Sequence, residues 1–262
     1  MESSPNTPAP VDEYGTAKVF FDQAVLCRNS GDYENARLNF EYSINELIKY
    51  LNYNPCMDIL GGVSLNLQWN QATREKGLTY LYQAIRANNT YYIDDGAEIV
   101  SEAFNKTQSL IQSKEFVNLS PIVKQKVWFE QGMNLHYLGR LEAERSFMPG
   151  ISKSVVLGPV VFRRPGHTSL AMQHFERAND LLVMSNDSFG VCLNAVYGLH
   201  YSMHGAITSP DLDKWSERID HELDHLEYIN PAQYASAMTL IERHAEACKY
   251  NISLNQSFRL NP

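Results

Sequence analysis

The chain has 262 residues, of which 44% are hydrophobic and 20% charged, with 30 acidic against 22 basic side chains. This composition is typical of a globular protein and excludes a disordered or collagen-like chain, while the length predicts one or two domains. The formal net charge of −8 argues against a general nucleic-acid binder and against a protein of anionic membrane surfaces, since both need a basic face.

The N-terminal stretch and the cysteines indicate the cellular compartment of the protein. Residues 1–13 contain three prolines and no helical periodicity, which predicts a disordered tail. The tail has neither a basic nor an apolar segment, so we expect no signal peptide, and no apolar run approaches the length of a membrane helix. The four cysteines form no C-x-x-C pair, which argues against a zinc or disulfide scaffold. We therefore expect a cytoplasmic or nuclear protein that takes no cofactor.

Helical periodicity begins at Tyr14 and persists almost to the end of the chain. A first helix ends at Asn29-Ser30-Gly31, and Asp32 is the expected N-cap of a second helix that stops near Asn52. Because the turn between them is short, these two helices should be antiparallel neighbours. Further helices are predicted at 71–87, 96–113, 121–147, 167–185, 189–204, 210–228 and 231–249.

Two segments break this pattern. Gly61-Gly62 interrupts residues 56–70, for which we predict a loop with one short helix. Residues 148–167 carry no helical pattern and are interpreted as an insertion. The sequence therefore predicts an all-α fold with a single domain over 14–250 and a C-terminal tail over 251–262.

The first helix pair carries a pattern of large, small and turn residues at fixed spacing. Its members are Phe20, Ala24, Gly31-Asp32-Tyr33, Ala36, Phe40 and Ser43. This stretch resembles a tetratricopeptide repeat, in which small residues let the two helices approach and a glycine with positive φ ends the first helix. Any helical hairpin with alanine at its contact gives part of this pattern. A microtubule-interacting-and-transport module over 15–51, or an unrelated helical bundle, is therefore an alternative.

The pattern recurs later in the chain with a gap. A second match has its first helix before the insertion and its second helix after it, at Trp128, Gly132, Leu135, Gly139, Ala171, Phe175 and Ala178. A weaker third match places Tyr197, Gly198, Tyr201 and Gly205 on a first helix, while 56–120 matches poorly. The resemblance implies an antiparallel helix-pair solenoid with one long insertion and a concave groove lined by first helices.

Carried over position by position, the resemblance assigns groove residues to the first two matches. They are Lys18, Phe21, Val25, Arg28 and Asn29 in the first match, and Lys126, Phe129, Met133, His136 and Tyr137 in the second. The family's carboxylate-clamp positions hold Phe21, Val25, Phe129 and Met133, so the groove is expected to be apolar and to take a hydrophobic peptide or helix. The alternative is that these side chains only pack against neighbouring repeats.

The insertion is a second candidate contact surface. A segment of this length without secondary structure is usually functional or disordered. Its apolar centre includes Val156, Leu157 and Phe162, which we expect to pack on a partner or on the solenoid itself. Arg163-Arg164 is too short a basic run to indicate nucleic-acid binding.

One motif suggests an enzyme. His221-Glu222-Leu223-Asp224-His225 matches H-E-x-x-H, in which two histidines on a helix bind zinc and the glutamate activates water. Against this, the apolar face of the same helix would turn both histidines toward solvent, and neither Glu242 nor Glu246 lies at a diagnostic spacing for a third ligand. The leading prediction is a non-enzymatic adaptor for a protein or peptide, with no nucleic acid or membrane as partner. A zinc peptidase and a receptor for a small peptide or ligand are the alternatives, and self-association is left open.

Overall fold

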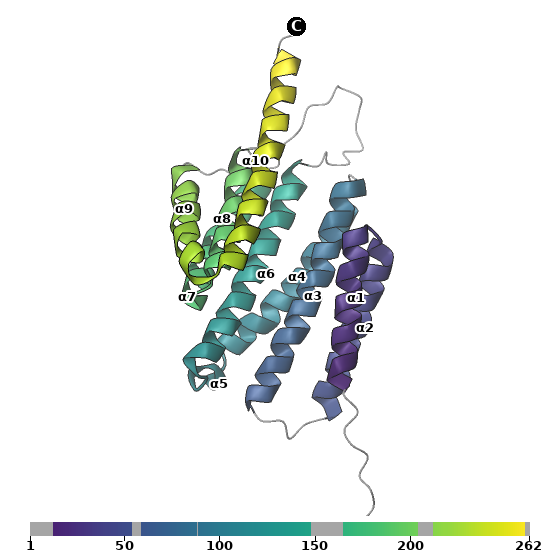
Figure 1. Ribbon diagram of the computed structural model, residues 1–262. Helices are drawn as coiled ribbons and strands as arrows, with labels where there is room; N and C mark the ends of the chain where they lie inside the picture. The colour runs from purple at the N-terminus through teal and green to yellow at the C-terminus, as the bar shows by residue number, and fades with distance from the viewer. Residues whose placement is uncertain (1–12, 54–58, 88, 148–164, 204–211, 260–262) are drawn as a thin grey trace, which may run out of the picture.

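The protein is all-helical throughout the part described by the computed structural model, which covers residues 13–53, 59–87, 89–147, 165–203 and 212–259 (Figure 1). The helices in chain order are α1 (Glu13–Ser30), α2 (Tyr33–Tyr53), α3 (Ile59–Ala87), α4 (Tyr91–Ile111), α5 (Lys114–Val117), α6 (Pro121–Phe147), α7 (Pro165–Ser185), α8 (Ser188–Met203), α9 (Leu212–Ile229) and α10 (Pro231–Arg259). The predicted all-α class is confirmed for these residues.

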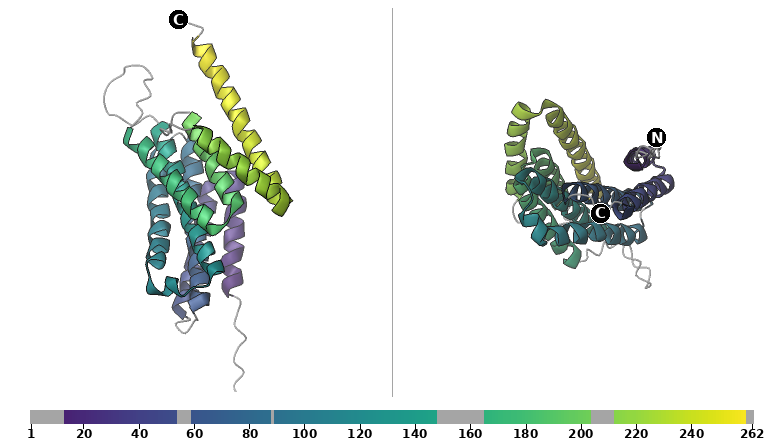
Figure 2. Two further views of the ribbon diagram at one scale, coloured as in Figure 1. Left: turned by 90° about the vertical axis from the view of Figure 1, so that its left-hand side faces the viewer. Right: turned by 90° about the horizontal axis from the view of Figure 1, so that it is seen from below.

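The long helices pack in consecutive pairs. α1 lies along α2, α3 along α4, α6 along α7 and α8 along α9. Each pair then contacts the next, through α2 with α3, α4 with α6, and α7 with α8, and α10 packs against α8 and α9. Seen from below, the helices follow a curve with α1 near one end (Figure 2).

Glycines set the closeness of several pairs. A Cβ added at Gly77 of α3 would lie 2.4 Å from Val100 Cγ2 of α4, and one at Gly132 of α6 would lie 2.8 Å from Leu182 Cγ of α7. A Cβ at Gly139 of α6 would meet the ring of Phe175 at 3.1 Å. The predicted pairing of α6 with α7 across the insertion is therefore confirmed, with the small residues at the contact.

The buried apolar side chains form a series of clusters along the chain. One cluster joins α1, α2 and α3 around Leu47, Leu65 and Trp69. A larger one joins α3, α4, α6, α7 and α8, and a third runs from α6 to α10 around Trp215. Each helix pair thus buries its apolar face against its neighbours along the chain.

The predicted turn and N-cap between the first two helices are confirmed, and a cap of the same kind begins α10. Gly31 has φ +83° between α1 and α2, and Asp32 Oδ1 accepts the backbone N–H of Asn35 at 3.2 Å. Asn230 Oδ1 accepts the backbone N–H of Gln233 at 3.2 Å at the start of α10. These side chains satisfy helix N–H groups that have no partner within the helix.

The predicted loop over 56–70 is wrong from residue 59 onward, because α3 begins at Ile59 and includes Gly61-Gly62. Each glycine costs about 1 kcal/mol in a helix interior. Burial of Leu65, Trp69 and Ala72 against α1 and α2 offsets that cost. Local sequence preference gives way here to tertiary packing.

Other predicted boundaries shift as well. α4 begins at Tyr91 and not at residue 96, and the short helix α5 was not predicted. α10 continues to Arg259, ten residues past its predicted end at 249 and into the segment predicted as a tail. α7 begins at Pro165, while the rest of the predicted insertion, 148–164, lies outside the described residues.

Candidate functional site

Two hollows flank α3 on the same face of the molecule. The first, of about 380 Å³, lies between α1, α2 and α3. The second, of about 420 Å³, lies between α3 and α6. Gln68 and Gln71 of α3 line both hollows. We treat them as two compartments of one surface, the α1–α3–α6 groove.

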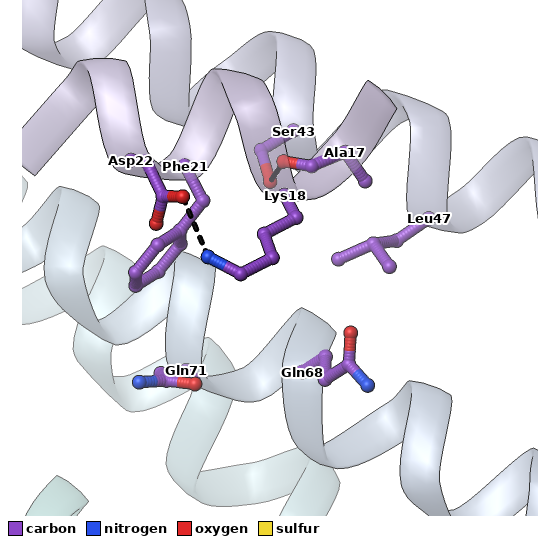
Figure 3. Close-up of a pocket in the computed structure, with 8 residues that line it drawn as sticks. All are labelled: Ala17, Lys18, Phe21, Asp22, Ser43, Leu47, Gln68 and Gln71. Carbon is purple, nitrogen blue, oxygen red and sulfur yellow. Dashed lines mark hydrogen bonds and ion pairs between the residues drawn. The ribbon is translucent and has the colours of Figure 1, made fainter. Parts of the chain in front are cut away.

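The compartment beside α1 has an apolar wall and a charged rim (Figure 3). Phe21 packs edge-on against the buried Phe40, with ring centroids 5.5 Å apart, and Leu47 lines the wall from α2. Lys18 Nζ and Asp22 Oδ2 form an ion pair at 2.5 Å on the exposed rim. Gln68 and Gln71 face these side chains from α3 in Figure 3.

The compartment beside α6 is more apolar. Val63 and Leu67 from α3 face Val123 and Phe129 from α6. Lys126 is exposed at its edge. Both compartments thus combine a half-buried phenylalanine with an amide pair and a lysine.

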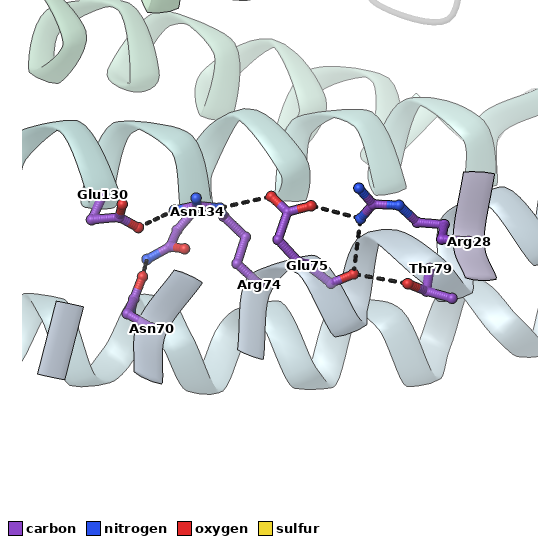
Figure 4. Close-up of polar contacts among 7 residues, drawn as sticks. All are labelled: Arg28, Asn70, Arg74, Glu75, Thr79, Glu130 and Asn134. Carbon is purple, nitrogen blue, oxygen red and sulfur yellow. Dashed lines mark hydrogen bonds and ion pairs between the residues drawn. The ribbon is translucent and has the colours of Figure 1, made fainter. Parts of the chain in front are cut away.

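A chain of buried polar contacts fixes the three helices beside this groove (Figure 4). Arg28 of α1 pairs with Glu75 of α3 at 2.6 Å, and Arg74 of α3 pairs with both Glu75 and Glu130 of α6. Burial lowers the pKa of the Arg74 guanidinium, but Glu130 and Glu75 outweigh it and raise that pKa above its ordinary value. Arg74 therefore stays charged and links α3 to α6.

Amide contacts reinforce the same junction. Asn134 of α6 donates to Asn70 Oδ1 of α3 at 3.1 Å, and Asn70 in turn donates to the Ala103 carbonyl of α4 at 2.6 Å. All three residues are buried. The backbone that carries the groove is therefore held by directional bonds as well as by apolar packing.

Four residues predicted for the groove do line it. Lys18 and Phe21 line the compartment beside α1, and Lys126 and Phe129 line the compartment beside α6. They occupy corresponding positions on two first helices of the proposed repeats. Val25 is half-buried further along α1 and is not among the residues that line either compartment.

Four more of the predicted groove residues lie inside the fold, while Asn29 is exposed near the end of α1 and is not among the residues that line either compartment. Arg28 is engaged by Glu75, while Met133, His136 and Tyr137 are 6%, 0% and 8% exposed. Neighbouring helices cover this stretch of α6, so the expectation that these side chains face a partner is corrected here. Met133, His136 and Tyr137 pack against neighbouring helices.

His136 is held in one protonation state by its surroundings. Asn194 donates its amide to the Phe175 carbonyl at 2.9 Å, which turns Asn194 Oδ1 toward His136 Nδ1 at 3.1 Å. His136 Nδ1 must then carry the hydrogen and donate it. Burial, together with the charge of Arg140, lowers the pKa of His136 to about 3. The imidazole is therefore neutral in the folded protein.

The histidine pair of the H-E-x-x-H motif lies on an exposed face of α9, as its helix pattern predicts. His225 Nδ1 lies 2.8 Å from Ser188 Oγ of α8, beside a hollow of about 210 Å³ that His221 and Glu222 also line. No group of three or more histidine, cysteine or acidic residues placed to hold a metal occurs among the described residues. Val156, Leu157 and Phe162 of the predicted insertion lie outside the described residues.

The residues that the sequence did not single out are three on α3 and one on α6. Gln68 and Gln71 fall in or next to the segment predicted as a loop, and Glu75 and Glu130 gave no local signal. The partners of the buried ion pairs are 47 and 56 residues apart, so no short motif contains them.

Comparison with protein-family models, with curated proteins and with solved structures gave no match to this chain. No helix in the described part of the chain combines the length and apolar character needed to cross a membrane. The groove, its polar support and the buried side chains of the first helices are therefore the basis for a functional assignment.

Proposed function

We propose that this protein is a non-enzymatic adaptor that binds a helix or extended peptide of another protein in the α1–α3–α6 groove. The observation that carries the proposal is the repetition of one arrangement on two sides of α3. Phe21 and Phe129 stand half-buried in hollows that share Gln68 and Gln71. An array of tetratricopeptide-like helix pairs presents its first helices in this way.

The lining indicates the chemistry of the partner. Two apolar compartments on either side of a helix suit two apolar side chains of one peptide. The amide side chains of Gln68 and Gln71 between the compartments suit backbone or side-chain hydrogen bonds. Lys126, exposed at the rim of the compartment beside α6, favours an acidic residue next to the apolar ones, whereas Lys18 is already paired with Asp22. The expected partner segment is therefore amphipathic, with an acidic residue at the α6 side.

The groove is supported for binding by its rigid base. The ion pairs and amide bonds between α1, α3 and α6 fix the spacing of the two compartments before a partner arrives. A site that needs little rearrangement loses less free energy on binding.

Photocrosslinking in cells tests this proposal. A photoreactive phenylalanine analogue at Lys126 should give one discrete protein adduct. The same analogue at Val183, which is 55% exposed on α7, should give none. Gln71→Arg, which places a long charged side chain between the two compartments, should abolish the adduct. Equal adducts from both positions, or an adduct that Gln71→Arg leaves unchanged, would contradict the proposal.

A receptor for a small ligand is the second candidate, because the two compartments fall within the size range of small-molecule sites. The crosslinking experiment separates the two, since a small ligand gives no protein adduct. Native mass spectrometry of protein purified without denaturation would then show a bound mass that Gln71→Arg removes.

A further inference from the structure

Three buried arginines lie along the first helices, and two of them have carboxylate partners. Arg28 pairs with Glu75, and Arg74 pairs with Glu75 and Glu130. The third, Arg140 of α6, is 5% exposed and has neither an ion pair nor a hydrogen bond within the part of the chain that the structure describes. Its Nε, like those of Arg28 and Arg74, is sealed from solvent and has no hydrogen-bond acceptor, so the missing ion pair is what distinguishes Arg140.

Aromatic rings surround the Arg140 guanidinium. Its Cζ lies 4.0 Å from the ring centroid of Tyr197 and 5.7 Å from those of Tyr82 and Tyr137. The same rings also contact the paired arginines, because Arg28 lies over Tyr82 and Arg74 over Tyr137. Arg140 therefore continues the row of arginines and tyrosines. Unlike Arg28 and Arg74, it has no carboxylate partner among the described residues.

The rings stabilise a cation through their faces, yet they do not replace a carboxylate. A guanidinium presents a planar fork of N–H donors, and a carboxylate accepts two of them at once. A buried cation whose N–H groups have no acceptor costs several kcal/mol relative to water. Tyr82 and Tyr197 are half-buried, whereas Tyr137 is 8% exposed.

The one nearby acid is engaged elsewhere. Glu144, one turn further along α6, accepts the Tyr201 hydroxyl hydrogen bond at 2.7 Å and makes no ion pair with Arg140. Arg140 therefore makes no ion pair within the described residues, although its charge acts on the Glu144 carboxyl, whose pKa burial raises above its ordinary value.

We infer that Arg140 and its tyrosine box form a binding site for a carboxylate. Arg28 and Arg74, which share its tyrosine rings, are already paired with carboxylates, so Arg140 is the one arginine of the row without a carboxylate partner among the described residues. One unpaired positive charge suits a monoanionic carboxylate better than a phosphate, which usually needs more than one positive charge or a helix N-terminus. The inference is independent of the α1–α3–α6 groove, because small carboxylates alone test it. The carboxylate belongs either to a chain terminus or to an acidic side chain of a larger ligand.

Side-chain nuclear magnetic resonance of ¹⁵N-arginine-labelled protein tests the site. Sodium acetate, compared with sodium chloride at equal ionic strength and pH 7, should shift the Arg140 Nε–H resonance in a saturable way. The matched control is Arg37, which also stacks on a tyrosine, 4.7 Å from the Tyr80 centroid, but already donates to Gln83. Its resonance should not move. An Arg140 resonance that responds equally to acetate and chloride would overturn the inference.

Two further titrations identify the source of the carboxylate and test the role of Glu144. N-acetylglycine presents a terminal carboxylate, and N-acetylglutamate α-amide presents a side-chain carboxylate. The compound that binds with the higher affinity shows whether the ligand's carboxylate belongs to a chain terminus or to an acidic side chain. Glu144→Gln removes the nearby acid and should tighten acetate binding. If Glu144→Gln alone shifts the Arg140 resonance while acetate has no effect on the unmodified protein, Glu144 is the partner of Arg140 in solution and the site is refuted.

Discussion

Acidification should destabilise this protein through His136. The side chain is fully buried, and burial lowers its pKa to about 3, whereas an unfolded histidine titrates near pH 6.5. Between these values the unfolded chain binds a proton that the folded protein does not. The contribution of His136 is thus fully present above about pH 6.5 and is lost as the pH falls. Each pH unit below 6.5 costs about 1.4 kcal/mol, which gives about 2 kcal/mol at pH 5.

Urea unfolding at pH 7 and pH 5 measures this effect. His136→Gln has no group that protonates in this range. The unmodified protein should lose about 2 kcal/mol more than His136→Gln between the two pH values. His221→Gln, at an exposed position of α9, is the control and should behave like the unmodified protein. Equal losses in the unmodified protein and in His136→Gln would refute the burial argument.

Three other substitutions test the packing that supports the site. Glu130→Ala leaves the buried Arg74 with only its longer contact to Glu75, and chemical denaturation should show a loss of about 3–5 kcal/mol; a loss below 1 kcal/mol would mean that the pair contributes little. Gly198→Ala places a Cβ 3.0 Å from the buried ring of Trp215, so calorimetry should show a lower midpoint and a cost of about 1–3 kcal/mol, and an unchanged midpoint would contradict the close α8–α9 contact. Gly31→Ala forces a side chain into φ +83° and should cost about 1 kcal/mol in urea unfolding, which a fully stable variant would disprove.

The features that the sequence predicted correctly are local ones. The positive φ of Gly31 and the cap at Asp32 follow from the chemistry of a few adjacent residues. The pairing of α6 with α7 was also predictable, because Gly139 and Phe175 kept the spacing of a helix contact across the intervening segment.

The features that were missed depend on the whole fold. α3 includes Gly61 and Gly62, which disfavour a helix locally, because Leu65 and Trp69 are buried against α1 and α2. Only some of the predicted groove residues line the groove, because burial by neighbouring helices cannot be read from one helix. The repeat pattern places Phe129 and His136 on one helix, but it does not say that neighbouring helices bury His136 completely. The ion pairs beside the groove join residues about 50 positions apart and have no sequence signature.

The central claim is that the α1–α3–α6 groove binds a protein segment. Its most direct test is a titration of the segment identified by crosslinking, made as a synthetic peptide, against three proteins. These are the unmodified chain, Gln71→Arg in the groove, and Gln173→Arg at an exposed position of α7. We expect Gln71→Arg to weaken binding at least about tenfold, which corresponds to about 1.4 kcal/mol, while Gln173→Arg binds like the unmodified protein. Equal affinity of all three proteins would contradict the claim.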